Sequence, residues 1–268
     1  MRRTDSGIAT SPVTLAGATV IVTRPSATAA TLKRRIAALG GIALGLPGVG
    51  LRAAEDSGGA RAALSDARKA ELAVFISPAA VRYAFALLPS LHFARAVHVC
   101  AVGAGTARAL QRRGVRRVLW PTPRQDSEGL LALAEFARLR GRRIALIGAP
   151  GGRDLLPAAL RARGALVQSI HVYKRAVPRL TRRHFAALEQ ATPPLLTLLS
   201  SAEALGNLCA QLPAPLFTRL AAGDVIVSSL RLAQAARSAG FARVHVASSA
   251  TSADMLVGAA CALAHHRL

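Results

Sequence analysis

Short apolar runs alternate with longer amphipathic segments along almost the whole chain. Each run is typical of a buried strand, and in each following segment apolar residues recur at the spacing of one helix face. The pattern predicts ten strands, at residues 18–23, 42–46, 72–76, 97–102, 116–120, 143–147, 165–172, 195–199, 224–228 and 243–247. Apolar strands separated by helices favour parallel sheets covered on both faces, so we expect an α/β protein with two five-stranded, doubly wound sheets.

The chain also repeats itself over a long distance. The element that runs from Thr19 to Gly40 recurs 124 residues later, from Arg143 to Gly164. At the same offset residues 75–81 match residues 199–205, and at an offset of 123 residues 102–108 match residues 225–231. A period this long exceeds solenoid repeats and indicates two copies of one domain-sized unit, with a cleft between them of the kind that usually binds ligands.

Length and composition are typical of a globular protein. With 268 residues, of which 52% are apolar, the chain can build one large or two modest cores. It has neither an uninterrupted apolar stretch of roughly 18 residues nor a signal-peptide pattern, and the polar residues 1–13 are expected to be a disordered leader. Cys100, Cys209 and Cys261 are widely spaced, which indicates neither disulfides nor zinc and favours a reduced, cytoplasmic location.

The net charge of +22 favours an acidic ligand and raises the alternative of nucleic-acid binding. Only Lys33, Lys69 and Lys174 are lysines among the 35 basic residues, an arginine bias that genome composition alone can produce. Aromatic residues make up only 4% of the chain, which leaves few platforms for stacking bases. We therefore expect an acidic small molecule as the ligand, and neither a nucleic acid nor a membrane as a partner.

Hydroxyl residues stand where several predicted strands meet the following helices. They are Thr23, Ser77, Thr106, Ser200-Ser201 and Ser228-Ser229. Serine and threonine are ordinary helix N-caps, each worth about 1 kcal/mol, and capping alone explains any one of them. Their recurrence at one edge of both predicted sheets, beside the N–H groups of helix N-termini, indicates a shared site for carboxylate or phosphate.

Several motifs for cofactors, metals and catalysis are incomplete. Gly103-x-Gly105 follows a strand, but Arg108 occupies the third small position of the dinucleotide fingerprint. The glycines of residues 148–152 lack the Gly-Lys-Ser/Thr of a phosphate loop, and no His-x-x-His pair occurs. We interpret His265-His266 as solvated, and the scattered histidines nominate no catalytic base. Neither a nucleotide cofactor nor a metal is predicted.

A set of short motifs stands in an order and spacing that few families share. The set comprises Val22-Thr23-Arg24-Pro25, Leu46-Pro47, Phe75-Ile76-Ser77-Pro78-Ala79-Ala80-Val81, Ala101-Val102-Gly103-Ala104-Gly105-Thr106-Ala107, Ser127-Glu128-Gly129-Leu130-Leu131, Gly152-Arg153-Asp154-Leu155-Leu156, Val172-Tyr173-Lys174-Arg175, Ser200-Ser201-Ala202-Glu203-Ala204-Leu205, Ser229-Leu230-Arg231-Leu232-Ala233 and Gly240-Phe241. In this arrangement the chain resembles the bacterial uroporphyrinogen-III synthase family over about residues 18 to 260.

The resemblance implies a cyclising hydro-lyase of tetrapyrrole (haem, sirohaem and cobalamin) biosynthesis. Such an enzyme closes the linear tetrapyrrole hydroxymethylbilane with inversion of ring D and loss of water, giving uroporphyrinogen III. The resemblance implies no cofactor and no metal, and a transient contact with hydroxymethylbilane synthase is also expected. It further implies two flavodoxin-like domains, one of them discontinuous, joined by a two-stranded linker. Mapped onto this chain, residues 14–45 with 180–268 form one domain, residues 52–168 form the other, and residues 46–51 and 169–179 form the linker.

The chemistry of that family requires steering more than reactive groups. Loss of hydroxide from a pyrrolic hydroxymethyl group gives an azafulvene, and unassisted closure gives the uninverted isomer, so the protein must direct attack through a spiro intermediate. Departure of hydroxide needs a proton donor, and Tyr173, in the place of the family's linker tyrosine, is the expected general acid. The alternative for Tyr173 is a packed aromatic with its hydroxyl at solvent. The residues expected to bind the substrate carboxylates, with nearby backbone N–H groups, are Arg24, Ser77, Thr106, Ser201 and Ser229.

Two other classes of protein are alternatives to this enzyme. A non-catalytic two-lobed binding module for an acidic metabolite would bind a tetrapyrrole without changing which isomer forms. A nucleic-acid-associated basic protein would show DNA binding that falls steeply with salt.

Overall fold

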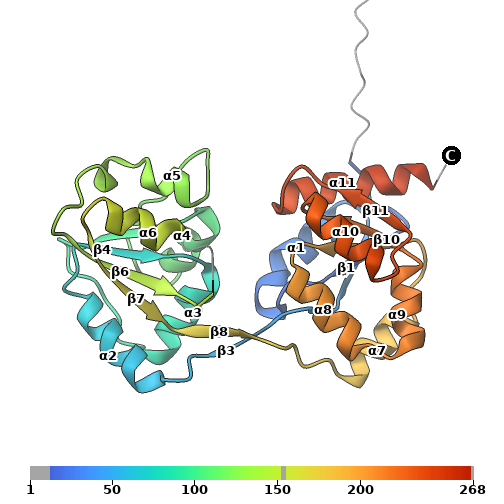
Figure 1. Ribbon diagram of the computed structural model, residues 1–268, viewed down its shortest axis with the longest axis horizontal. Coiled ribbons are helices and arrows are strands. Elements are labelled where there is room, and N and C mark those ends of the chain that lie inside the picture. The colour runs from blue at the N-terminus through green and yellow to red at the C-terminus, as the bar shows by residue number, and fades with distance from the viewer. Residues whose placement is uncertain (1–12, 152–154, 267–268) are drawn as a thin grey trace, which may run out of the picture. The chain divides into compact units, whose positions relative to one another are not determined.

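The computed structural model describes residues 13–151 and 155–266, so all but the last residue of the expected leader, residues 1–13, lies outside the described residues. The chain divides into two compact units (Figure 1). Unit 1 comprises the residues up to Gly50 and those from Val177 onward, and unit 2 comprises Leu51–Ala176. The chain therefore crosses from one unit to the other twice, after Gly50 and after Ala176.

Unit 1 contains a five-stranded sheet in the order β11-β10-β9-β1-β2, with every neighbouring pair parallel. Its strands are β1 (Thr19–Val22), β2 (Ile42–Gly45), β9 (Leu195–Leu199), β10 (Asp224–Val227) and β11 (Arg243–Val246). Its helices are α1 (Ser26–Ala38), α7 (Arg182–Glu189), α8 (Ala202–Gln211), α9 (Ala214–Ala221), α10 (Leu230–Ser238) and α11 (Ser252–His265). The five strands predicted for this sheet are confirmed.

Helices cover both faces of the unit 1 sheet, because alternate residues of each buried strand point to opposite faces. Ile21 of β1 belongs to a core formed with α8, α9 and α10. Its neighbours Val20 and Val22 belong to a second core, formed with α1 and α11. Full burial of each such side chain stabilises the fold by about 1.5–3 kcal/mol.

Unit 2 contains a four-stranded parallel sheet in the order β5-β4-β6-β7. Its strands are β4 (Leu72–Phe75), β5 (His98–Ala101), β6 (Arg143–Gly148) and β7 (Leu166–His171). Its helices are α2 (Ser57–Ala67), α3 (Pro78–Leu87), α4 (Ala104–Gln111), α5 (Ser127–Leu131), a 3₁₀ turn at Ala134–Phe136, and α6 (Leu155–Ala162). No helix in the described part of the chain is both long and apolar enough to cross a membrane.

The predicted fifth strand of unit 2, at residues 116–120, is wrong. These residues run beside β5 but form only one isolated bridge, between Leu119 and Cys100. Two arginines open the run, and Pro121, which has no N–H to extend a ladder, closes it. The other four strands have cores on both faces, one formed with α2, α3 and α4 and the other with α5, α6 and the 3₁₀ turn.

Two further strands, β3 (Gly50–Ala53) and β8 (Tyr173–Ala176), pair with each other in a separate two-stranded sheet (Figure 1). They lie at the points where the chain crosses between the units. Most of their residues are half-buried or exposed, and only Tyr173 is buried. Each also has only four residues, which include Arg52 in β3 and Lys174 and Arg175 in β8, so neither forms an apolar run that the sequence pattern could reveal.

Candidate active site

Ser77 lies just beyond the carboxyl end of β4, where it is the N-cap of α3. Its backbone is extended, with φ −161° and ψ 160°, and its Oγ accepts a hydrogen bond from the N–H of Ala80 at 3.0 Å. Pro78 occupies the first helical position, where the missing N–H costs nothing and the fixed φ already suits the helix. The same Oγ lies 3.1 Å from the hydroxyl oxygen of Tyr173. Two of the predicted site residues are therefore within hydrogen-bond distance of each other.

Tyr173 is the first residue of β8, and only 8% of it is exposed. Its ring stacks on Tyr83 of α3, with the ring centres 5.4 Å apart and the planes at 16°. The hydroxyl of Tyr83 donates a hydrogen bond to the carbonyl of Leu51 at 2.8 Å, and the guanidinium of Arg82 lies 4.7 Å from the centre of the Tyr83 ring. Tyr173 is thus a packed aromatic, but its hydroxyl contacts Ser77.

Thr106 lies inside the first turn of α4 and not at the cap of that helix. The N-cap is Gly103, and the N–H of Ala104 donates to Oε1 of Gln125 at 3.0 Å. Thr106 is only 4% exposed. Gln125 therefore occupies one N–H group of a helix N-terminus that the sequence had suggested for a ligand.

Thr106 and Ser229 have different positions at the start of their helices. Strand β5 ends at Ala101 and runs beside β4, the strand that precedes Ser77. Strand β10 ends at Val227 and runs beside β9, the strand that precedes Ser201. Just beyond these strand ends stand the helix N-caps Gly103 and Ser229. Ser229 is therefore a helix N-cap, whereas Thr106 lies three residues beyond the N-cap of its helix.

In unit 1 the predicted serines are helix caps at the carboxyl edge of the sheet. Ser201 Oγ accepts from the N–H of Ala204 at 3.4 Å, and Ser229 Oγ accepts from the N–H of Leu232 at 3.3 Å. Ser201 is half-buried and Ser229 is exposed. Both capping roles are those that the sequence offered as the simpler interpretation.

Arg24 follows β1 at the same edge. Its guanidinium donates to Oγ of Ser252 at 3.2 Å and to the carbonyl of Ala250 at 2.9 Å. Partial burial lowers the pKa of Arg24, although an arginine side chain stays charged at neutral pH. These two contacts hold a cation at the carboxyl edge of the unit 1 sheet.

Two pockets meet near the carboxyl end of β7 in unit 2. One has a volume of about 410 Å³, with apolar walls that include Ile76 and Leu156 and polar groups from Ser127, Ser169 and His171. The other, of about 340 Å³, shares Ser169 and His171 and is also lined by Tyr173. Two larger hollows, of about 660 and 650 Å³, lie along the outer strands β7 and β2, and the described residues that line them include none of the predicted site residues.

The structure thus brings Ser77 and Tyr173 into contact and places Thr106 in the same unit, while Arg24, Ser201 and Ser229 lie in unit 1. Sequence reasoning missed Tyr83, Gln125, Ser169 and His171 at this site. One signal for Tyr83 was available. The chain contains only two tyrosines, and these two stack on each other.

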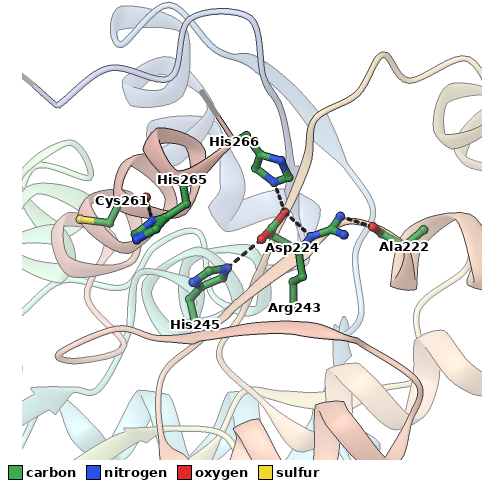
Figure 2. Close-up of polar contacts among 7 residues, drawn as sticks. All are labelled: Ala222, Asp224, Arg243, His245, Cys261, His265 and His266. Carbon is green, nitrogen blue, oxygen red and sulfur yellow. Dashed lines mark hydrogen bonds and ion pairs between the residues drawn. The ribbon is translucent and has the colours of Figure 1, made fainter. Parts of the chain in front are cut away.

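A separate polar cluster surrounds Asp224, the first residue of β10, at the amino edge of the unit 1 sheet (Figure 2). The Asp224 side chain is 2% exposed and accepts hydrogen bonds from His245 at 2.7 Å, His266 at 2.5 Å and Arg243 at 3.1 Å. Burial opposes ionisation, but hydrogen bonds from His266, His245 and Arg243 outweigh it and hold the pKa of Asp224 below its usual value.

His265 and His266 are both exposed, in agreement with the interpretation from the sequence, but each also contacts another group of the protein. His266 contacts Asp224, and Nδ1 of His265 lies 2.7 Å from the carbonyl oxygen of Cys261. Across residues 13–151 and 155–266, no group of three or more His, Cys, Asp or Glu side chains is arranged to hold a metal ion. The cluster therefore connects the C-terminal end of α11 to the first residue of β10, at the opposite end of that strand from the helix N-caps.

Comparison with known proteins points to a single family. The family model described as uroporphyrinogen-III synthase HemD matches residues 30–257. The chain is 29% identical to the uroporphyrinogen-III synthase of Escherichia coli K12 and 30% identical to that of Salmonella typhimurium LT2, in each case over 245 residues, which are 88% of this chain and 98% of the relative.

Solved structures show a similar fold. A mutant uroporphyrinogen III synthase from the extremely thermophilic bacterium Thermus thermophilus matches with a TM-score of 0.50 and 21% identity, over 92% of this chain and 99% of that one. The uroporphyrinogen-III synthetase of Helicobacter pylori 26695 matches with a TM-score of 0.53 and 13% identity, over 93% and 99%.

Proposed function

The chain belongs to the uroporphyrinogen-III synthase family, and we infer that it catalyses the reaction of that family, with Ser77 and Tyr173 at the reacting end of the substrate. It closes hydroxymethylbilane into uroporphyrinogen III with inversion of ring D and loss of water, as a cyclising lyase. The match to the family over residues 30–257 is the observation that carries this assignment.

Tyr173 is the proposed general acid. As the C–O bond of the hydroxymethyl group breaks, the Tyr173 hydroxyl passes its proton to the departing oxygen, which leaves as water, while the pyrrole nitrogen, which keeps its own proton, supplies the electron pair that forms the cationic azafulvenium. Ser77, 3.1 Å away, can turn its O–H toward the resulting phenolate and stabilise it with a charge-assisted hydrogen bond. The proton that ring D releases on final closure restores the phenol.

The carboxylate contacts are a second part of the proposal. Arg24 supplies a fixed positive charge in unit 1, while Ser201 and Ser229 supply hydroxyls beside the N-termini of α8 and α10. In unit 2, Ser77 has the same position on α3. Thr106 keeps a binding role only if its buried hydroxyl becomes accessible, so we rank it below the serines.

The pocket of about 410 Å³ in unit 2 suits one pyrrole ring with its two acidic arms. Its apolar walls suit the flat face of the ring, and its polar side chains, Ser127, Ser169 and His171, can donate hydrogen bonds to carboxylates. The pocket shares Ser169 and His171 with the one that Tyr173 lines, which supports placing a ring next to the proposed acid.

We also propose that the two units are copies of one ancestral domain. In unit 1 the strands run β11-β10-β9-β1-β2, and in unit 2 they run β5-β4-β6-β7, with Leu119 bridging the far side of β5. The strands related by the 124-residue repeat, β1 with β6 and β9 with β4, are neighbours in each sheet. The proposal keeps the predicted domain limits, with the linker at residues 46–51 and 169–179. The proposed function also includes a cytoplasmic location and a transient contact with hydroxymethylbilane synthase.

A coupled assay tests the function directly. Hydroxymethylbilane is generated in place with and without the purified protein, and the uroporphyrinogen isomers are separated after oxidation. Isomer III is expected in excess over the isomer I that forms spontaneously. A product ratio equal to that of buffer would reject the enzyme and favour a binding module, and retention on DNA that weakens with salt would favour the nucleic-acid alternative.

Substitution of Tyr173 tests the mechanism. Tyr173→Phe keeps the stacked ring and removes only the proton donor, so turnover is expected to fall on the order of 10²-fold, the low end for general acid catalysis, with little change in product affinity. Ser57→Ala, which alters an exposed hydroxyl bonded to the carbonyl of Ala54, is the control and should keep full turnover. Unchanged turnover in Tyr173→Phe would remove Tyr173 from its role but leave the isomer assay untouched.

A further inference from the structure

We propose that Tyr83 is a positioning residue, which fixes the ring of Tyr173 and thereby aims its hydroxyl at Ser77. The inference rests on the proposed role of Tyr173, and nothing in the family motifs named above includes Tyr83. What carries it is a continuous set of contacts that runs from Leu51 through Tyr83 and Tyr173 to Ser77.

Tyr83 is itself held at two points. Its backbone lies in α3, the helix that Ser77 caps, and its hydroxyl donates to the carbonyl of Leu51 in β3 at 2.8 Å. Strand β3 pairs with β8, whose first residue is Tyr173. The Tyr83 ring therefore joins the three elements that must keep their places if the Tyr173 hydroxyl is to stay near Ser77.

The stack restricts the one motion that would separate the hydroxyl pair. With the backbone of β8 fixed, Tyr173 can move its hydroxyl only by rotating its side chain, and a parallel ring 5.4 Å away blocks that rotation on one side. The Arg82 guanidinium over the Tyr83 ring, at 4.7 Å, adds a cation–π contact that favours the same ring position. A proton donor must be held in place in this way, because a small misplacement lowers the rate of proton transfer.

Kinetics separate positioning from a general structural role. Tyr83→Leu removes the flat ring, and kcat is expected to fall about tenfold with KM almost unchanged. In the Tyr173→Phe background the same change is expected to cost no more than twofold, since the acid that Tyr83 positions is already absent. The proposal would be overturned if Tyr83→Leu lowered kcat equally in the parent protein and in Tyr173→Phe, or if it did not lower kcat in the parent protein.

Matched variants control for folding. Phe217→Leu breaks an aromatic pair of similar separation, 5.9 Å from Phe241 in unit 1, and should leave kcat unchanged. Tyr83→Phe keeps the stack, loses only the bond to Leu51, and should stay within threefold of the parent. If Tyr83→Leu does not fold, as judged by circular dichroism, Tyr83→Met is used in its place, because it keeps side-chain volume without a flat ring.

A spectroscopic test does not depend on turnover. Because the chain has only two tyrosines, labelling with 3-fluorotyrosine gives two ¹⁹F signals, which the Tyr83→Phe and Tyr173→Phe variants assign. Ser77→Ala should shift the Tyr173 signal in the parent but not in Tyr83→Leu, where the hydroxyls have separated. An equal shift in both backgrounds would overturn the proposal, whereas full activity of Tyr173→Phe would instead reject the general acid.

Discussion

Replacing Asp224 by asparagine tests the cluster in Figure 2 through the stability of unit 1. The change keeps the shape of a buried side chain that is 2% exposed, but it removes the negative charge that receives hydrogen bonds from Arg243, His245 and His266. Asparagine keeps one acceptor oxygen. Its NH₂ group replaces the second carboxylate oxygen and therefore places a donor opposite the donor groups of the neighbouring side chains.

The expected loss is about 2 kcal/mol of unfolding free energy. Each hydrogen bond to a charged group is worth about 1.5–3 kcal/mol, so three of them would suggest a larger loss. The partners, however, are 50%, 33% and 32% exposed, and water can solvate them once the carboxylate is gone. For a unit of this size the loss corresponds to a fall in melting temperature of about 4–8 °C.

The loss should depend on pH with a definite sign. The hydrogen bonds hold the pKa of Asp224 below its usual value, so its ionisation stabilises the folded state at every pH above the unfolded pKa of about 3.9. That contribution disappears as pH falls through the lowered folded pKa. Thermal denaturation of both proteins between pH 3 and pH 8 should give the full difference at pH 7 and a shrinking one below about pH 4. Equal stability at pH 7, or a difference that does not change with pH, would refute the reasoning.

Two further predictions concern groups that the proposed reaction does not use. Burial raises the pKa of the Cys100 thiol to about 12. At pH 8 a disulfide reagent should therefore modify the exposed Cys209 and Cys261 and react with Cys100 only after unfolding. Modification of all three thiols at one rate would contradict this. The buried Oγ of Thr197 has no hydrogen-bond partner within residues 13–151 and 155–266, so Thr197→Val should raise the unfolding free energy by about 1 kcal/mol, and a destabilised variant would show that the hydroxyl is satisfied.

The pattern of apolar residues predicts all nine described strands of the two larger sheets, including the outermost strands β2, β7 and β11, which bury few side chains. It fails at residues 116–120, where two arginines open the run and only Leu119 forms a bridge. It is silent about β3 and β8, because each has only four residues and these include charged side chains, Arg52 in β3 and Lys174 and Arg175 in β8. The resemblance to a family was needed to predict a two-stranded linker.

In the candidate site, the sequence predicts features that depend on neighbouring residues but not contacts between residues far apart in the chain. Helix caps such as Ser77, Ser201 and Ser229 can be predicted, because a serine between an apolar run and an amphipathic segment is a local signal. Contacts between residues far apart in the chain cannot be predicted in this way. Ser77 and Tyr173 are 96 residues apart, and Asp224 and His266 are 42 residues apart, so no periodicity relates them.

The double crossing of the chain between its units has a consequence for synthesis on the ribosome. Strand β1 is made early, but its partner β9 belongs to the last third of the chain, and unit 2 is completed between them. At about 5–20 residues per second, the roughly 150 residues that separate β2 from β9 take about 8–30 s to translate. During that interval β1 and β2 have only each other to pair with, and a nascent chain arrested before β9 should contain a folded unit 2 beside an N-terminal segment that proteases can still cut.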